Sequence, residues 1–177
     1  GDGNRWTRSD GLTNWNYVLK LNDTDAPVDK SGNGNMSAPT STVFSINNTD
    51  ILGAGAQKII CYCFANSDWI NSGKYEGNGN ANGSFIYTGF RPALVTIKRI
   101  DSTGSWHVYD DARDTYNAAD TYLLWDTTGS DDTASSNAID LLSNGFKLRN
   151  TAAGLNGSGN DYIYLAMAHN PFKYATA

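Results

Sequence analysis

GSFIYTGFRPALVTIKR (residues 83–99), GSWHVYDDAR (residues 104–113) and NGFKLRNTAAGLNGSGNDYIYLAMAHNPFK (residues 144–173) are the most regular stretches of the chain. In each of them, short runs of apolar and aromatic residues alternate with polar residues and end in Asn, Asp or Gly. Alternation with a period of two is typical of strands that bury one face. The three stretches therefore predict β-strands joined by turns.

The composition points the same way. The 177 residues include 17 Asp but one Glu, 20 Asn but one Gln, and 18 Gly. Glu and Gln favour helices, whereas Asn, Asp and Gly favour turns, so we expect strands and turns almost throughout. With 40% hydrophobic residues, the chain can bury a two-layer core. We expect one all-β domain over residues 1–177, an antiparallel β-sandwich of jelly-roll or concanavalin A-like type.

Alternation also assigns faces to single residues. A strand over residues 15–21 is expected to bury its odd-numbered side chains. In residues 93–99, the pattern places Val95 and Ile97 toward the core and Thr96 and Lys98 toward solvent.

Two further segments have distinctive patterns. Residues 139–142 and 146–148 form a predicted hairpin, because Asn144-Gly145 is a pair favoured in two-residue turns. Residues 162–168 are apolar on both faces, which predicts a central strand.

The chain contains a partial internal repeat. FSINNT (residues 44–49) resembles FKLRNT (146–151), and IICYCFA (59–65) resembles YIYLAMA (162–168). The two members of each pair are separated by nearly the same number of residues, so we expect a partial repeat copy in residues 1–65 and a complete one in residues 66–177. Because residue 1 falls inside the first copy, the pattern predicts either the C-terminal end of a longer protein or a shortened relative.

The order of short motifs in the second copy is specific. YTGFRP leads into IKR; WHVYD follows, then NGFK, an Asn/Gly turn, and an aromatic strand before NPFK. This order resembles the C-terminal repeat module of tail-fibre and other virion structural proteins of tailed bacteriophages, especially marine ones. The resemblance covers residues 61–173 and brings no catalytic motif. It implies a virion protein made in the host bacterial cytoplasm, with other virion proteins as partners and a homo-oligomeric state, a trimer being one option.

Charge and hydropathy exclude two partner classes. The net charge is −5 and the sequence pI is near 4.8, whereas nucleic-acid binding depends on neutralising phosphates. No apolar run reaches the roughly 20 residues needed to span a bilayer. We expect neither nucleic-acid binding nor membrane insertion.

Cys61 and Cys63 are the two cysteines. In a strand, side chains at i and i+2 lie about 7 Å apart, too far for a relaxed disulfide. We expect two buried, unbridged thiols in a strand over residues 59–65, consistent with folding in a reducing compartment.

Catalytic and metal-binding patterns are weak. Glu76 lies in a Gly-rich segment without an evident second carboxylate, and the two histidines lack zinc-site spacing. We therefore predict a non-enzymatic protein that needs no cofactor. Calcium stays an open alternative at the aspartates of two acidic stretches, Asp23, Asp25 and Asp29 or Asp131 and Asp132.

The best candidate binding residues lie in a polar stretch around two aromatic residues. Long Asn/Gly/Ser segments predict surface loops at residues 31–42, 71–84 and 127–137. Aromatic faces combined with adaptable polar groups suit sugar binding. The candidate ligand-binding residues are Asp68, Trp69, Tyr75, Asn78 and Asn80. The competing interpretation is that Trp69 and Tyr75 close the edge of the core.

The resemblance thus implies a structural protein of a phage tail fibre or surface appendage, and the aromatic and polar candidate residues favour attachment to a host-surface glycan. Two alternatives stay open. One is a capsid decoration or head-fibre protein, whose partner is the shell. The other is a carbohydrate-active enzyme of the β-sandwich type, which requires a second carboxylate facing Glu76.

Overall fold

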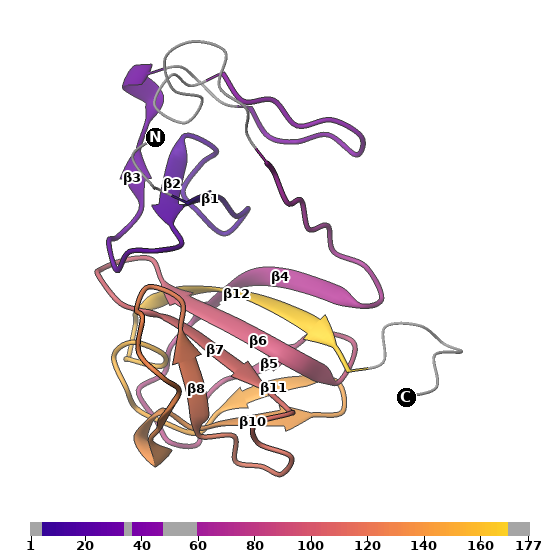
Figure 1. The fold of residues 1–177 in the computed structure, drawn as a ribbon, viewed down its shortest axis with the longest axis vertical. Helices are drawn as coiled ribbons and strands as arrows, with labels where there is room; N and C mark the ends of the chain where they lie inside the picture. Colours follow the sequence, from indigo (N-terminus) through magenta and orange to yellow (C-terminus); the bar gives the residue numbers. More distant parts are fainter. Residues whose placement is uncertain (1–4, 34–36, 48–59, 170–177) are drawn as a thin grey trace.

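The computed structural model describes residues 5–33, 37–47 and 60–169, and β-strands dominate this part of the chain (Figure 1). The strands are β1 (Trp6–Thr7), β2 (Tyr17–Lys20), β3 (Val28–Asp29), β4 (Ile70–Glu76), β5 (Phe85–Tyr87), β6 (Pro92–Arg99), β7 (Trp106–Asp110), β8 (Thr121–Leu124), β9 (Asp132–Thr133), β10 (Ile139–Leu142), β11 (Gly145–Leu148) and β12 (Asp161–Ala168). Two short 3-10 turns, η1 (Ser31–Asn33) and η2 (Ser135–Asn137), follow β3 and β9. No helix in the described residues is long and apolar enough to span a membrane.

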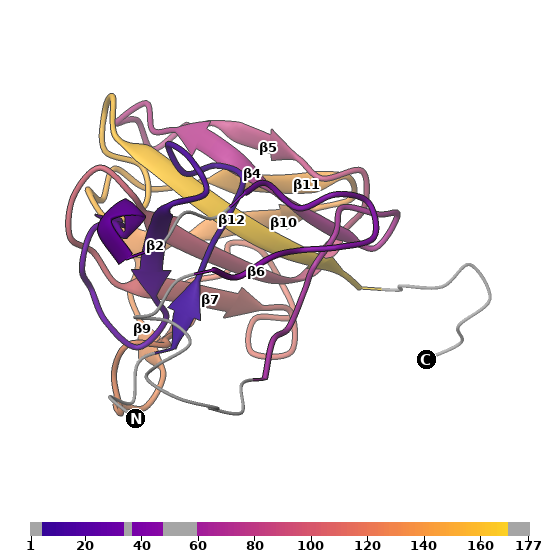
Figure 2. The ribbon, with the colours of Figure 1, turned by 90° about the horizontal axis from the view of Figure 1, so that it is seen from above.

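The strands form three antiparallel sheets. The largest has the order β4-β12-β6-β7-β8-β9, and the sheet β10-β11-β5 packs against one of its faces (Figure 1). The sheet β1-β2-β3 lies on the opposite side, and Figure 2 shows this N-terminal part lying over β12 and β6. The expected antiparallel β-sandwich is confirmed.

The main core lies between the six-stranded sheet and β10-β11-β5. Its aromatic centre contains Tyr75 stacked on Tyr162, with ring centroids 5.0 Å apart, and Phe146 edge-on to Tyr164. Burying a large apolar side chain contributes about 1.5–3 kcal/mol, so this layer stabilises the sandwich. Its buried members are Tyr75, Ile86, Val95, Ile97, Tyr109, Ala119, Tyr122, Ile139, Leu141, Phe146, Leu148, Leu155, Tyr162, Tyr164 and Ala166.

A second, smaller core lies on the outer face of the six-stranded sheet. Leu12 and Leu19 of the N-terminal part pack there against Trp106 and Ile163. The indole Nε1 of Trp106 donates a hydrogen bond to the Lys20 carbonyl, 2.9 Å away. The N-terminal strands therefore cover part of a sheet face that would otherwise meet solvent.

This cover corrects the predicted orientation of Thr96 and Lys98 as solvent-facing. Val95 and Ile97 face the main core as expected, but Thr96 and Lys98 are 2% and 0% exposed beneath the N-terminal part. Lys98 Nζ donates to the Thr24 and Gly104 carbonyls at 3.2 and 2.8 Å. Burial lowers the pKa of Lys98 to about 8.

The predicted central strand and hairpin are confirmed, with one shift. β12 lies between β4 and β6, and β10 pairs with β11. The turn is Ser143-Asn144, one residue earlier than predicted, because Gly145 already pairs with Leu142. A Cβ on Gly145 would lie 2.1 Å from the Ile86 carbonyl oxygen, so close strand approach explains the glycine.

Other segment predictions need correction. The predicted loop over residues 71–84 begins with most of β4, and residues 127–137 contain β9 and η2. The predicted strand over residues 15–21 is shorter. Val18 and Leu19, which point to opposite faces of β2, are both buried, and Leu19 packs against the outer face of the six-stranded sheet.

The environment of the cysteines was also predicted wrongly. Cys61 and Cys63 are unbridged, as expected, but they are exposed. Residues 60–65 form no strand, and Ile59 lies outside the described residues. The thiols therefore lack the neighbouring strands that would bury them.

Candidate functional site

The predicted ligand-binding residues do not form one site. Asp68 and Trp69 precede β4, whereas Asn78 and Asn80 follow it. A strand rises about 3.3 Å per residue, so the seven residues of β4 separate the two pairs by about 20 Å.

Tyr75 belongs to the core. Its side chain is buried, it stacks on Tyr162, and its hydroxyl donates to the Leu155 carbonyl at 2.7 Å. Burial raises the pKa of Tyr75 well above its ordinary value. This residue closes the core and is not accessible to a ligand.

Asn78 and Asn80 are exposed but bound to the framework through Asn156. The backbone N–H of Asn78 donates to Asn156 Oδ1 at 3.0 Å, and Asn156 Nδ2 lies within 3.1 Å of Asn78 Oδ1 and the Asn80 carbonyl. Asn156 itself is fully buried and also donates to the Asn150 carbonyl at 2.7 Å. This polar network holds two loops together.

Trp69 lies at the other end of β4, 41% exposed. Its carbonyl accepts a hydrogen bond from Ala168 N at 2.9 Å, and the next residue, His169, donates its N–H to the Arg91 carbonyl. His169 Nδ1 contacts the Asp111 carboxylate. We call Asp68, Trp69, Arg91, Asp111 and His169 the Trp69 surface.

Glu76 has a carboxylate neighbour that the sequence did not reveal. Asp161 lies directly opposite Glu76 in the β12–β4 register. Side chains at such positions lie about 5 Å apart. However, Lys74 Nζ binds Asp161 at 2.8 Å, and neither carboxylate lines the cavity described next.

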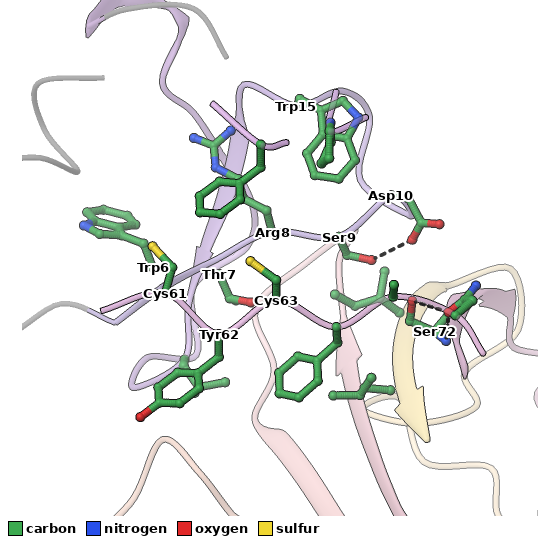
Figure 3. Close-up of a pocket in the computed structure, with 18 of the residues that line it drawn as sticks. Trp6, Thr7, Arg8, Ser9, Asp10, Trp15, Cys61, Tyr62, Cys63 and Ser72 are labelled. Atoms are coloured by element: carbon green, nitrogen blue, oxygen red, sulfur yellow. Dashed lines mark hydrogen bonds between the residues drawn. The ribbon is translucent and has the colours of Figure 1, made fainter. Parts of the chain in front are cut away.

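A cavity of about 1330 Å³ opens between the N-terminal part and the outer face of the six-stranded sheet (Figure 3). Residues 5–10, 37–46 and 60–66 form its walls, and side chains of β6 and β12, including Leu94, Thr96 and Ile163, form its floor. We call this opening the cleft. Small-molecule pockets usually measure about 300–1,000 Å³, so the cleft suits a larger occupant.

One wall of the cleft is an exposed apolar segment. Ile60 and Tyr62 are each 82% exposed, and Phe64 is 50% exposed. Figure 3 shows Cys61 and Cys63 pointing toward Trp6 and Arg8, with Tyr62 pointing the opposite way. No backbone hydrogen bond joins residues 60–65 to any other residue that the structure describes.

The cleft also contains buried polar groups without partners in the described structure. Both terminal nitrogens of Arg8 and the Thr96 hydroxyl are buried and make no hydrogen bond. Burial lowers the pKa of Arg8. An unsatisfied buried donor costs about 1–3 kcal/mol, so an occupant that supplies carbonyl or carboxylate oxygens would recover this energy. The sequence did not mark either residue as functional, since Arg8 belongs to no motif and Thr96 alternates like a solvent-facing strand residue.

The aspartates considered for calcium have other partners. Asp23 and Asp25 accept from Lys20 Nζ at 3.3 and 3.4 Å, and Asp29 accepts from Ser31 N at 2.8 Å. Asp131 lies 3.6 Å from Arg113 Nε, and Asp132 accepts from the Tyr122 hydroxyl at 3.0 Å. Within residues 5–33, 37–47 and 60–169, no three His, Cys, Asp or Glu side chains are grouped to hold a metal ion.

Residues 2–171 match the profile of a family described as "Domain of unknown function (DUF7483)". The chain belongs to this family. A search of curated proteins and a search of solved structures found no match for this DUF7483 protein.

Proposed function

We propose that this DUF7483 protein is a non-enzymatic structural module of a bacteriophage virion, in a tail fibre or comparable surface appendage. The cleft is the surface through which it assembles, as a homo-oligomer and with other virion proteins. The phage assignment rests on the motif resemblance of residues 61–173. The observation that carries the assembly role is the exposed apolar segment Ile60, Tyr62 and Phe64 beside a cleft with unpaired donors.

A polypeptide partner suits the chemistry of this cleft. Apolar side chains of a partner would cover Ile60 and Tyr62, and its backbone carbonyls would accept from Arg8 and Thr96. Exposed apolar surfaces rimmed by polar groups are typical of protein interfaces.

The assembly role is tested with two matched tyrosines. Tyr62 and Tyr116 are 82% and 85% exposed, but Tyr62 alone lines the cleft. We expect Tyr62→Asp to weaken self-association by about 10-fold or more, because a charge would be desolvated at the interface, and Tyr116→Asp to leave it unchanged. Sedimentation equilibrium over a wide concentration range measures this.

A chain that stays monomeric at every concentration, and that binds no purified virion protein, contradicts the assembly role. Binding to purified empty heads in preference to tails would support the alternative of a capsid decoration or head-fibre protein.

Host-surface glycan attachment is the second role that we propose, and the Trp69 surface is its site. The Trp69 surface combines an exposed aromatic residue with the His169–Asp111 pair, so it offers a stacking face and polar partners for sugar hydroxyls. Trp69→Ala should abolish binding to an array of bacterial lipopolysaccharide and capsular polysaccharide fragments. The Tm should change by only a few degrees, because Trp69 is not a core residue. Tyr87→Ala, another exposed aromatic change, serves as the control. Equal binding by Trp69→Ala and the parent protein would refute this site.

The same array tests the enzymatic alternative. Glu76→Gln should leave glycan binding unchanged, and the parent protein should release no sugar fragments. Hydrolysis that disappears in Glu76→Gln would make the Glu76–Asp161 pair a catalytic candidate and overturn the non-enzymatic proposal.

A further inference from the structure

The N-terminal sheet repeats part of the six-stranded sheet. β1 and β7 each begin at a tryptophan. The residue after that tryptophan pairs with the following strand in the same way in both places, because Thr7 of β1 lies opposite Leu19 of β2 and His107 of β7 lies opposite Leu124 of β8. The next pairing also matches, because Tyr17 lies opposite Asp29 and Tyr122 lies opposite Asp132. β1-β2-β3 therefore has the registers of β7-β8-β9.

The correspondence continues beyond these strands. η1 (SGN) follows β3 as η2 (SSN) follows β9. A turn at Ser41-Thr42 is closed by the Thr40 N–H, which donates to the Val43 carbonyl at 2.8 Å. The corresponding turn in the second copy is Ser143-Asn144, where Leu142 pairs with Gly145.

Residues 60–65 are the counterpart of β12 in sequence, but not in their surroundings. In the complete sandwich, β6 lies between β12 and β7 and pairs with both. In the N-terminal part, residues 60–65 and β1 both line the cleft, and the described residues place no strand beside β1 other than β2. The cleft is thus the position that β6 occupies in the other copy.

We infer that the cleft binds a β6-type strand, within a β4-β5-β6 segment supplied by another unit of the DUF7483 fold. This inference rests on the proposed function only in treating the cleft as an assembly surface. The strand pairs with β1 on one side and with residues 60–65 on the other, while a β4-type strand pairs with the second edge of residues 60–65.

The chemistry of the cleft fits this occupant. Strand addition supplies backbone partners for the unpaired groups of residues 60–65. Arg8 corresponds to Val108, which lies opposite Thr96 of β6, so the added strand passes beside the buried Arg8 guanidinium. Cys61 and Cys63 correspond to Tyr164 and Ala166 of the main core, so pairing would bury both thiols.

The thiols provide the readout for a fusion experiment. Residues 66–100 are duplicated directly before Gly1. The number of residues between the added β6 and Trp6 is then the same as the number between β6 and Trp106. We expect native-state labelling of Cys61 and Cys63 by a maleimide to slow by about 10-fold or more, because both thiols become buried in a central strand.

A matched control carries Val95→Asp and Ile97→Asp in the added copy alone, and its thiols should label as fast as those of the parent chain. A second fusion inserts about ten Gly/Ser residues at the junction, so that a strained junction alone cannot prevent pairing.

Unchanged labelling in both fusions overturns the inference, even if Tyr62→Asp weakens self-association and the cleft remains an assembly surface. Conversely, protected thiols in a fusion support the inference even where the parent chain shows no self-association.

Discussion

Phe146 and Phe44 occupy corresponding places in the two parts of this molecule, yet Phe146 is fully buried and Phe44 is 45% exposed. Residues 66–169 form two facing sheets around one core, whereas residues 5–33, 37–47 and 60–65 form one small sheet and line an open cleft. Similar local patterns thus have different outcomes, because a strand buries its apolar face only where a second layer and neighbouring strands are present.

The largest effect should come from this pair of phenylalanines. Phe146→Ala removes a ring packed on Tyr75 and Tyr164 and should lower the free energy of unfolding by about 3–5 kcal/mol. Phe44→Ala should cost less than about 1 kcal/mol, because the ring is partly solvated. Urea denaturation followed by Tyr and Trp fluorescence measures both. Equal losses would mean that residues 37–47 pack as tightly as the main core.

An intermediate effect is expected at the buried amide. Asn156→Ala leaves the Asn78 N–H and the Asn80 and Asn150 carbonyls without their partner, so we expect a loss of about 2–3 kcal/mol. Asn82→Ala, which removes an exposed contact to Lys147, should cost less than about 0.5 kcal/mol. Thermal unfolding compares the two, and a neutral Asn156→Ala would show that the amide network contributes nothing to stability.

The smallest expected effect is a change of folding stability with pH, which comes from Lys98 beneath the N-terminal part. The pKa of Lys98 is about 8 when folded and near 10.5 when unfolded, so above pH 8 the unfolded chain holds a proton that the folded protein has lost. From about pH 8 to 9.5, Lys98 should therefore make the free energy of unfolding rise by about 1 kcal/mol for each pH unit. Lys98→Met should remove this slope in urea titrations at each pH. An identical slope in the variant would mean that the N-terminal part does not keep Lys98 buried.

Features set by local alternation were predictable from the sequence. The central position of β12 follows from apolar residues on both faces, and the hairpin from Asn144-Gly145 between two apolar runs. β4 was mistaken for a loop because Asn71, Ser72 and Gly73 are polar or small, as an edge strand permits.

The remaining errors depend on contacts between distant segments. Lys98 alternates like a solvent-facing residue, and only the packing of Thr24 near it shows that it is buried. The predicted burial of Cys61 and Cys63 required neighbouring strands, and the local pattern does not show whether such strands are present. The candidate binding residues were separated for the same reason, since the length of β4 was hidden within an apparent loop.

The position of β12 has a consequence for synthesis of the protein. β12 is the last strand described, yet it lies between β4 and β6, and its first residue, Asp161, pairs with Glu76. A ribosome therefore completes β4 to β11 before the strand that joins β4 to β6 leaves the exit tunnel. During that interval the nascent chain exposes two unpaired strand edges, which are prone to aggregation. The sandwich closes only after residue 168 emerges, so folding of this unit is expected to be slow and to wait for the synthesis of β12.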